Sequence, residues 1–133
     1  MAIAFSVPGD PVPQPRPRVS TRGGFARAYV PKQHAVHAYR QAVAAAAREA
    51  GAGVHGDPVD VVIDLIWERP KSHLRKSGVK PDAPKTPRAD LDNCAKAVLD
   101  ALNGVAWEDD SQVTRLVVSK TYGTEARTTV RIS

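Results

Sequence analysis

Acidic side chains and one lysine gather in two short stretches of this sequence. The first stretch, Asp-Leu-Asp-Asn-Cys-Ala-Lys, runs from Asp90 to Lys96, and the second, Glu-Asp-Asp-Ser-Gln-Val, contains Asp110. Carboxylates gathered in this way repel one another unless a cation neutralises them. A set of carboxylate oxygens favours Mg²⁺ or Mn²⁺ over zinc as that cation. The pattern therefore indicates hydrolysis of phosphate esters, in which such an ion activates water and neutralises phosphate oxygens.

The spacing of these residues predicts that they can meet. Asp90 and Asp92 are two positions apart, which places both carboxylates on one side of an extended segment, and Asp92 is also a natural helix N-cap. Lys96 follows at i+4, so its ammonium can lean back over the same site. Because an extended chain spans ~3.3 Å per residue and a helix only ~1.5 Å, the segment from Leu102 to Asp110 is long enough to return to the helix start. We therefore expect three carboxylates to converge beside one lysine.

Each of these residues also has a purely structural interpretation. Asp92 can be a helix cap, Lys96 and Asp100 an exposed i,i+4 ion pair, and Asp109 and Asp110 turn residues before a strand. Caps and turns are individually more common than catalytic groups. Taken together, however, they explain less well why the acids and the lysine fall on reachable positions beside two basic loops.

An α+β domain, with a mixed sheet in the order β-α-β-α-β-β and two main helices packed on it, is predicted to position these residues. Alternating apolar residues and β-rich composition predict the strands, and apolar residues at helical spacing predict the helices. The predicted strands cover 3–7, 59–67, 113–122 and 126–132. The predicted helices cover 31–49 and 93–102. We expect residues 1–133 to form one domain, since this length suits one hydrophobic core.

Two basic, proline-rich loops interrupt this order, one after the first strand and one over residues 71–89. A structureless loop of the second length is usually functional or disordered in a small domain. The chain has 19 Lys plus Arg against 14 Asp plus Glu, a net charge of +5, which favours a polyanionic partner, nucleic acid before an anionic membrane. The basic side chains that we expect to contact DNA are Arg16, Arg18, Arg22, Arg27, Lys71, Arg75, Lys76, Lys80, Lys85 and Arg88.

Several classes of protein are disfavoured by what the sequence lacks. The single cysteine, Cys94, excludes an intrachain disulfide and a zinc ribbon and indicates a reducing cytoplasm. No apolar run is long enough to cross a membrane, and the N-terminus does not read as a signal peptide. No glycine-rich phosphate loop predicts a nucleotide cofactor. The four histidines show no ligand spacing to the acids and are interpreted as surface residues, and Trp67 and Trp107 as core or loop anchors.

The two acidic stretches resemble the signature of the RusA family of Holliday junction resolvases. That signature is an Asp-x-Asp-Asn-Leu-x-Lys run leading to Asp-Asp-x-Gln-Val, and here it corresponds to Asp90–Lys96 and Asp109–Val113. The stretch Asp100–Gly104 between them also fits, as does the proline-rich, arginine-ending segment 11–18. Two positions depart from the family pattern: Cys94 stands in place of leucine, and Ala89 in place of a basic residue.

The resemblance implies an Mg²⁺-dependent, structure-selective endodeoxyribonuclease that resolves Holliday junctions in recombination and repair. Such enzymes are homodimers that nick opposed strands, many are encoded by phages or prophages, and Mn²⁺ can replace Mg²⁺. It implies that Asp90, Asp92 and Asp110 are catalytic metal ligands and that Lys96 is the essential lysine beside them. Two alternatives stay open: a nucleic-acid-binding module whose acids are structural, and a metal phosphohydrolase acting on nucleotides.

Overall fold

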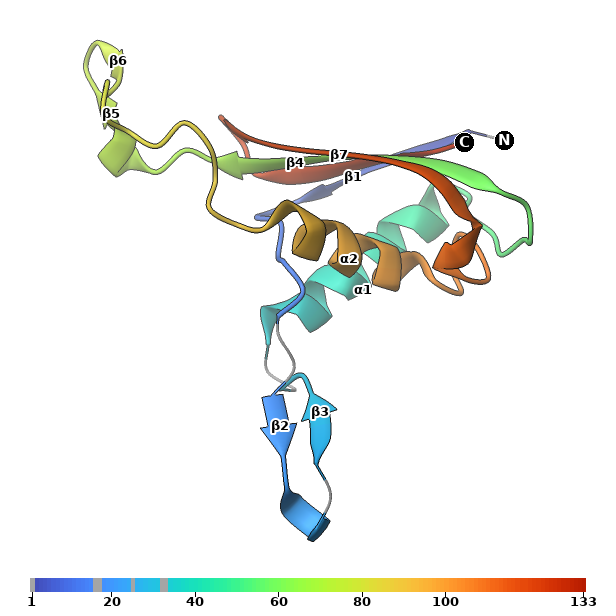
Figure 1. Cartoon of the computed structure of the whole chain (residues 1–133). Coiled ribbons are helices and arrows are strands. Elements are labelled where there is room, and N and C mark those ends of the chain that lie inside the picture. Colours follow the sequence, from blue (N-terminus) through green and yellow to red (C-terminus); the bar gives the residue numbers. More distant parts are fainter. Residues whose placement is uncertain (1, 16–17, 25, 32–33) are drawn as a thin grey trace.

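A four-stranded sheet with two helices on one face forms the body of the chain (Figure 1). The computed structural model describes residues 2–15, 18–24, 26–31 and 34–133. The sheet order is β1-β8-β4-β7, in which β4 and β7 are parallel and the other neighbours antiparallel. These strands are β1 (Ile3–Pro8), β4 (Val59–Glu68), β7 (Val113–Gly123) and β8 (Arg127–Ile132). The mixed sheet and the α+β class are as predicted.

The strand β4 supplies the centre of the core. Val59, Val61, Ile63 and Leu65 are buried on the face towards the helices, while the residues between them are only half-buried. This alternation is what the period of two in a strand produces when one face is covered. The predicted inward face is therefore confirmed over these four positions, and Trp67 at its end is half-buried.

The helix α1 (Ala35–Glu49) begins four residues later than the predicted start. His34 sets this boundary, because its Nδ1 accepts a hydrogen bond from the Val36 backbone N–H at 3.0 Å and so caps the helix. His37 Nε2 donates to the Pro31 carbonyl at 2.9 Å. The interpretation of these two histidines as surface residues is thus wrong, because both are half-buried groups that fix the helix start.

The helix α2 (Leu91–Leu102) packs beside α1 and buries Cys94, Ala97, Val98 and Leu102. After it, Trp107 is 0% exposed and its Nε1 donates to Asn103 Oδ1 at 2.7 Å. Tyr39 of α1 and Thr128 of β8 share a buried hydrogen bond of 2.5 Å, and burial raises the pKa of Tyr39 to about 12. The complete burial of Trp107 confirms the prediction that it anchors the core. No helix in the described part of the chain is long and apolar enough to cross a membrane.

Both basic loops carry a short antiparallel hairpin, where the sequence predicted no regular structure. The N-terminal arm consists of β2 (Arg18–Ser20), η1 (Arg22–Gly24) and β3 (Arg27–Tyr29). The central arm, residues 71–88, contains η2 (Lys71–His73), β5 (Leu74–Arg75) and β6 (Gly78–Val79). Gly23 at φ +81° and Gly78 at φ +118° take backbone conformations that other residues rarely adopt. Both hairpins project away from the sheet and helices (Figure 1).

Candidate active site

The start of α2 brings in the first two candidate carboxylates. Asp90 is the N-cap residue, and its backbone carbonyl accepts from the Cys94 N–H at 3.0 Å. Helical bonding thus begins before Asp92, so the prediction that Asp92 caps the helix is wrong, and Asp92 lies in the first turn instead. The Asp90 side chain makes no capping bond, although Asn93 Nδ2 donates to its Oδ2 at 3.2 Å. The partial positive charge of a helix N-terminus favours both carboxylates there.

Two tethers hold this helix start in place. Lys120 of β7 reaches across with its Nζ and donates to the Ala89 carbonyl at 2.8 Å. From the other side, the Gln14 N–H donates to the Asn93 carbonyl at 2.9 Å. Ala89, the residue before Asp90, is therefore fixed to the sheet, and the first turn of α2 is fixed to the segment after β1. The sequence pattern predicted neither contact.

Lys96 points along α2 towards its C-terminal end. Its Nζ lies 3.8 Å from Asp100 Oδ2, and Arg40 of α1 approaches the same oxygen at 3.5 Å. The expectation that Lys96 leans back towards Asp92 is not met, because the nearest carboxylate is one turn ahead and is itself held by Arg40. The Lys96 side chain is 62% exposed, and exposed pairs of this kind contribute only ~0–1 kcal/mol.

The third candidate, Asp110, opens a short turn of 3₁₀-helix, η3 (Asp110–Gln112), just before β7. Asp109 is its N-cap, and hydrogen bonds from the Ser111 side chain and from the Ser111 N–H lower the pKa of the Asp109 carboxylate. The interpretation of Asp109 and Asp110 as turn residues before a strand is thus structurally correct. It does not exclude a role for Asp110, whose side chain is exposed.

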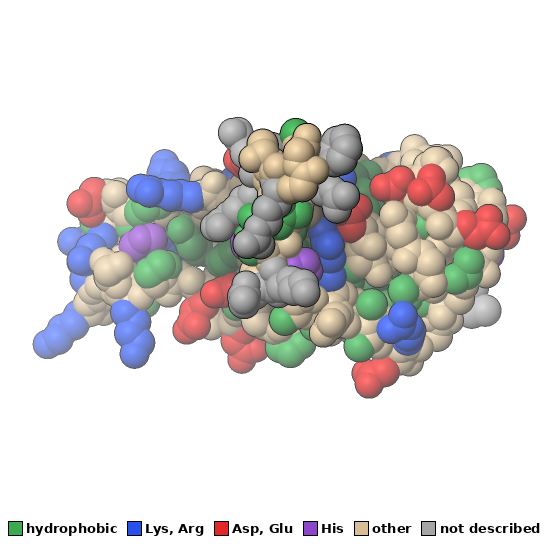
Figure 2. Space-filling view, turned by 90° about the horizontal axis from the view of Figure 1, so that it is seen from below, with side chains coloured by type: hydrophobic (Ala, Val, Ile, Leu, Met, Phe, Trp, Pro, Cys, Tyr) green, Lys and Arg blue, Asp and Glu red, His purple; other side chains and the backbone are tan. Residues whose placement is uncertain are grey.

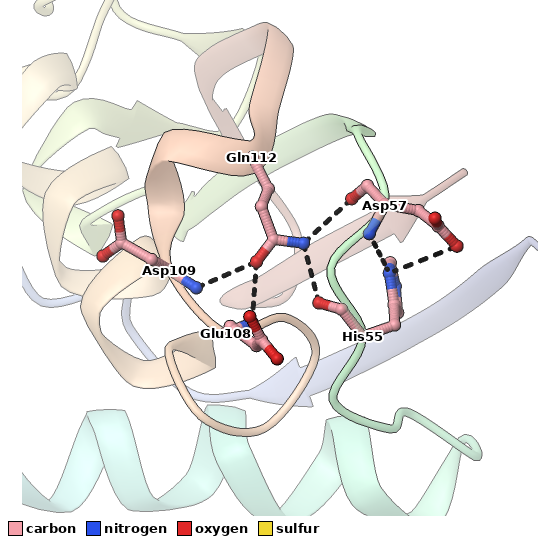
Figure 3. Close-up of polar contacts among 5 residues, drawn as sticks. All are labelled: His55, Asp57, Glu108, Asp109 and Gln112. Atoms are coloured by element: carbon pink, nitrogen blue, oxygen red, sulfur yellow. Dashed lines mark hydrogen bonds and ion pairs between the residues drawn. The ribbon is translucent and has the colours of Figure 1, made fainter.

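Gln112 ties this turn to the chain that leads into β4, as Figure 3 shows. Its Nε2 donates to the carbonyls of His55 at 2.7 Å and Asp57 at 2.9 Å. Its Oε1 accepts from the N–H groups of Glu108 at 2.8 Å and Asp109 at 3.0 Å. One amide therefore satisfies four backbone groups and holds the turn that carries Asp110. The spacing of Asp109 and Gln112 is a capping-box pattern that could have predicted the bond to the Asp109 N–H, but nothing in the sequence indicates the two bonds to the chain before β4.

One pocket of about 630 Å³ lies between α2 and β7 and is lined by Asp92, Lys96 and Asp110. Its remaining lining is apolar: Leu91, Ala95, Leu99, Leu116 and Val118. Asp90 does not line this pocket, although it directly precedes the helix. The structure thus brings two of the three predicted carboxylates and the predicted lysine to one concave surface.

The carboxylates do not form a ready three-ligand metal site. Over the described residues, no group of three His, Cys, Asp or Glu side chains is placed to hold an ion. Asp110 opens η3, the turn that leads into β7, whereas the residue before Asp90 is bonded to Lys120 near the far end of that strand. At ~3.3 Å per strand residue, Asp90 and Asp110 lie towards opposite ends of β7, so the expected convergence of three carboxylates is not met. The donor chemistry still fits Mg²⁺, since Asp92 and Asp110 offer oxygen ligands that no ion pair occupies in the described part of the chain.

Cys94 lies within the motif but is not available for chemistry. It is 1% exposed and packs in the core, and burial raises the pKa of its thiol to about 11. A thiol that stays protonated at neutral pH is a poor metal ligand and nucleophile. Cys94 therefore serves as a small apolar residue where the family pattern has leucine.

The central arm forms a basic surface beside this region. Its six predicted DNA-binding side chains, Lys71, Arg75, Lys76, Lys80, Lys85 and Arg88, are all exposed. In Figure 2, Lys and Arg side chains gather at the end of the molecule that carries this arm, while most of the acidic side chains in view lie elsewhere. Arg16 lies outside the described residues. For Arg18, Arg22 and Arg27 the structure describes the backbone of the N-terminal arm but not the side chains.

Comparison with known proteins agrees with the motif. The family described as "Endodeoxyribonuclease RusA" matches residues 8–133. A protein of Bacillus subtilis (strain 168), named "Uncharacterized protein YqaN", is 36% identical over 135 residues, which cover 98% of this chain and 94% of the relative. Both matches extend over almost the whole chain, and the family match includes the two acidic stretches, both arms and every strand after β1.

Proposed function

We propose that this chain, which belongs to the RusA endodeoxyribonuclease family, is an Mg²⁺-dependent, structure-selective endonuclease that resolves Holliday junctions. Residues 1–133 act as one nuclease domain, and two copies nick opposed strands during DNA recombination and repair, in the cytoplasm of a bacterial or phage-infected cell. The observation that carries the proposal is the pocket shared by Asp92, Lys96 and Asp110. The exposed cations of the central arm support a DNA substrate.

In this mechanism Asp90, Asp92 and Asp110 would hold the divalent ion, which requires Asp110 to approach the start of α2. When bound, Mg²⁺ or Mn²⁺ supplies an activated water and neutralises charge on the phosphate. Lys96 leaves its exposed pair with Asp100 at little cost and places its ammonium on the phosphate oxygens, where charge develops in the transition state. Arg40 keeps Asp100 neutralised when Lys96 moves away. The cations of the central arm hold the flanking phosphates.

The shape of the pocket supports a homodimer. Leu116 of the edge strand β7 is 41% exposed and Leu91 of α2 is 36% exposed, and both line the pocket. Apolar side chains give nothing to a phosphate backbone, but they suit a second protein surface. A second copy related by two-fold symmetry packs against these apolar side chains, leaves Asp92, Lys96 and Asp110 open to DNA, and gives the two cuts that a four-way junction needs. Sedimentation that shows only monomer at micromolar concentration, with one chain per junction, contradicts this arrangement.

The variant Asp92→Asn tests the proposed chemistry. It keeps the size of the side chain but removes a charge, so Mg²⁺ is held poorly and nicking of a synthetic junction is abolished. Junction affinity stays the same or increases, because one negative charge near the phosphates is removed. Asp82→Asn, in the exposed central arm, removes the same charge away from the pocket and is the matched control, with nicking retained.

The same variant separates catalysis from a non-catalytic role. The absence of a three-ligand cluster in the described chain is the observation that favours a nucleic-acid-binding module with structural acids. On that alternative, Asn at position 92 changes nothing, since the position is an exposed site in the first helical turn. If the folded Asp92→Asn protein nicks junctions at the wild-type rate, Asp92 is not a catalytic residue and most of the proposed mechanism is refuted.

A further inference from the structure

A second pocket, of about 420 Å³, lies where the central arm joins the sheet. Trp67 of β4 and Tyr122 of β7 line it and are partners in the register of the two parallel strands. Both residues stand at the carboxyl ends of their strands, the edge at which sheets with parallel strands commonly bind ligands. Of the residues that line this pocket, the proposed reaction uses only Arg88, and neither acidic stretch contributes a side chain.

The aromatic side chains of this pocket are held in fixed positions. The His73 ring meets the Tyr122 ring edge-on, with 5.6 Å between centroids and an interplanar angle of 88°. The Arg69 guanidinium lies 4.4 Å above the Tyr122 ring centre and donates to the Pro84 carbonyl at 2.9 Å. These contacts join the central arm to the end of β7, so the pocket keeps its shape without a ligand.

One polar atom of the pocket is left without a partner. His73 Nδ1 is buried and makes no hydrogen bond within the described residues. Leaving a buried polar atom unbonded costs free energy, and native proteins usually satisfy such atoms. Because the atom is covered, the His73 ring must turn to present it to a ligand, and the hydrogen bond then formed removes this cost.

The charged residues of the pocket narrow the chemistry of its ligand. Asp10 and Glu68 line it with exposed carboxylates, and Arg88 adds one cation. The two carboxylates repel a bare phosphate but accept hydrogen bonds from amino groups. A nucleobase combines a flat face for the aromatic side chains, exocyclic amino groups for the carboxylates, and a linked phosphate for Arg88.

We propose that this pocket binds one unpaired base of branched DNA, with preference for a base that carries an exocyclic amino group. Its location supports this assignment, because Ala89 lines the pocket and the next residue is Asp90. The base therefore lies next to the strand that is cut. A base at a branch point unpairs at lower cost than a base inside a linear duplex, so the pocket favours branched DNA over linear DNA. The proposal rests on the proposed function for its DNA ligand, but binding of the base does not require cleavage.

The test uses full-length wild-type protein in EDTA, so that no strand is cut, with 2-aminopurine placed at the branch point of a four-way junction. We expect the 2-aminopurine emission to change on the junction and not on a linear duplex that carries the same base. Emission from Trp67 is quenched at the same time. Trp107, which is 0% exposed in the core, supplies the unchanged background.

Two variants test the pocket residues. Trp67→Leu removes the large aromatic surface, and His73→Ala removes the unpartnered nitrogen and leaves the sheet untouched if the first variant fails to fold. In Trp67→Leu the ratio of junction to duplex affinity falls by roughly tenfold, the scale for removal of one base–aromatic stack. In His73→Ala the ratio falls by roughly two- to tenfold, the scale for loss of one hydrogen bond. Lys76→Ala, in the same arm, lowers both affinities together and leaves the ratio unchanged.

The proposal is overturned if 2-aminopurine emission is the same on junction and duplex, or if both variants keep the wild-type ratio. It is also overturned if free deoxyadenosine monophosphate displaces the signal at the concentration of the junction, because the pocket then binds nucleotides in general. Nicking of the junction in Mg²⁺ is measured separately. If the junction is nicked without a change in 2-aminopurine emission, only the base-binding proposal is refuted. If the emission changes but the junction is not nicked, the proposed nuclease function is refuted and the base-binding proposal stands.

Discussion

Replacing Gln112 by leucine should show how much the candidate site depends on one amide. The Gln112 side chain bonds two backbone carbonyls before β4 and two backbone N–H groups before η3. Leucine fills a similar space but offers no donor or acceptor. The variant therefore detaches the turn that carries Asp110 from the rest of the chain while it leaves every candidate catalytic side chain in the sequence.

The magnitude follows from the four hydrogen bonds. Each neutral bond contributes ~0.5–1.5 kcal/mol net, and water replaces part of this because Glu108 and Asp109 are exposed. We expect a loss of about 2–4 kcal/mol in the free energy of unfolding, taken as the lower part of that sum. For a chain of this size that corresponds to a decrease in Tm of roughly 6–14 °C. Nicking should fall by up to about a hundredfold, the cost of a ~1 Å displacement of a catalytic group.

The assay combines a thermal melt with junction affinity and nicking rate at a temperature where the variant is folded. Ser111→Ala is the control, because it alters the same turn but removes an exposed hydroxyl that carries none of the bonds to Gln112. We expect the control to keep the wild-type Tm and nicking rate. A Gln112→Leu protein with unchanged Tm and unchanged nicking refutes the view that this amide positions Asp110.

Three further predictions test other parts of the structure. A triple variant, Lys76→Ala, Lys80→Ala and Lys85→Ala, should weaken junction binding. The slope of log affinity against log salt concentration should decrease by about 0.9 for each phosphate that the variant no longer neutralises. An unchanged slope shows that the central arm does not contact the DNA. Leu65→Ala in the core should cost roughly 2–5 kcal/mol, read as a lower denaturant midpoint. Because its pKa is raised to about 11, Cys94 stays protonated at pH 8, so iodoacetamide should label it only after denaturation; rapid labelling of the native protein shows that the thiol is exposed.

The elements of the body could be predicted because their patterns are long. The alternation from Val59 to Leu65 and the apolar faces of α1 and α2 each repeat over several residues, and the structure has the expected helices and strands. The first residues of the helices could not be predicted as well, because each depends on the hydrogen bonds of a single capping residue. His34 starts α1 with a side-chain bond, and Asp90 starts α2 through its backbone.

The arms and the details of the site depend on contacts distant in sequence. Hairpins with strands of two or three residues leave no periodicity to detect. The motif identified Asp92, Lys96 and Asp110, and they do share a pocket. It could not show that Lys96 points forward, because that follows from Asp100 and from Arg40 on another helix. It also could not show the pairing of Trp67 with Tyr122, which arises from the parallel register of β4 and β7.

The position of β8 inside the sheet bears on when this protein becomes active during its own synthesis. β8 follows every other element in the chain, yet it lies between β1 and β4 and bonds to both. While the ribosome is still adding residues 127–132, β1 has no partner in the main sheet and β4 is paired only with β7. Since domains fold as units once their chain has emerged, the nascent protein carries both acidic stretches for a time without the sheet that places them. We therefore expect the protein to be inactive until β8 has been made, and a chain that terminates before residue 127 to stay inactive.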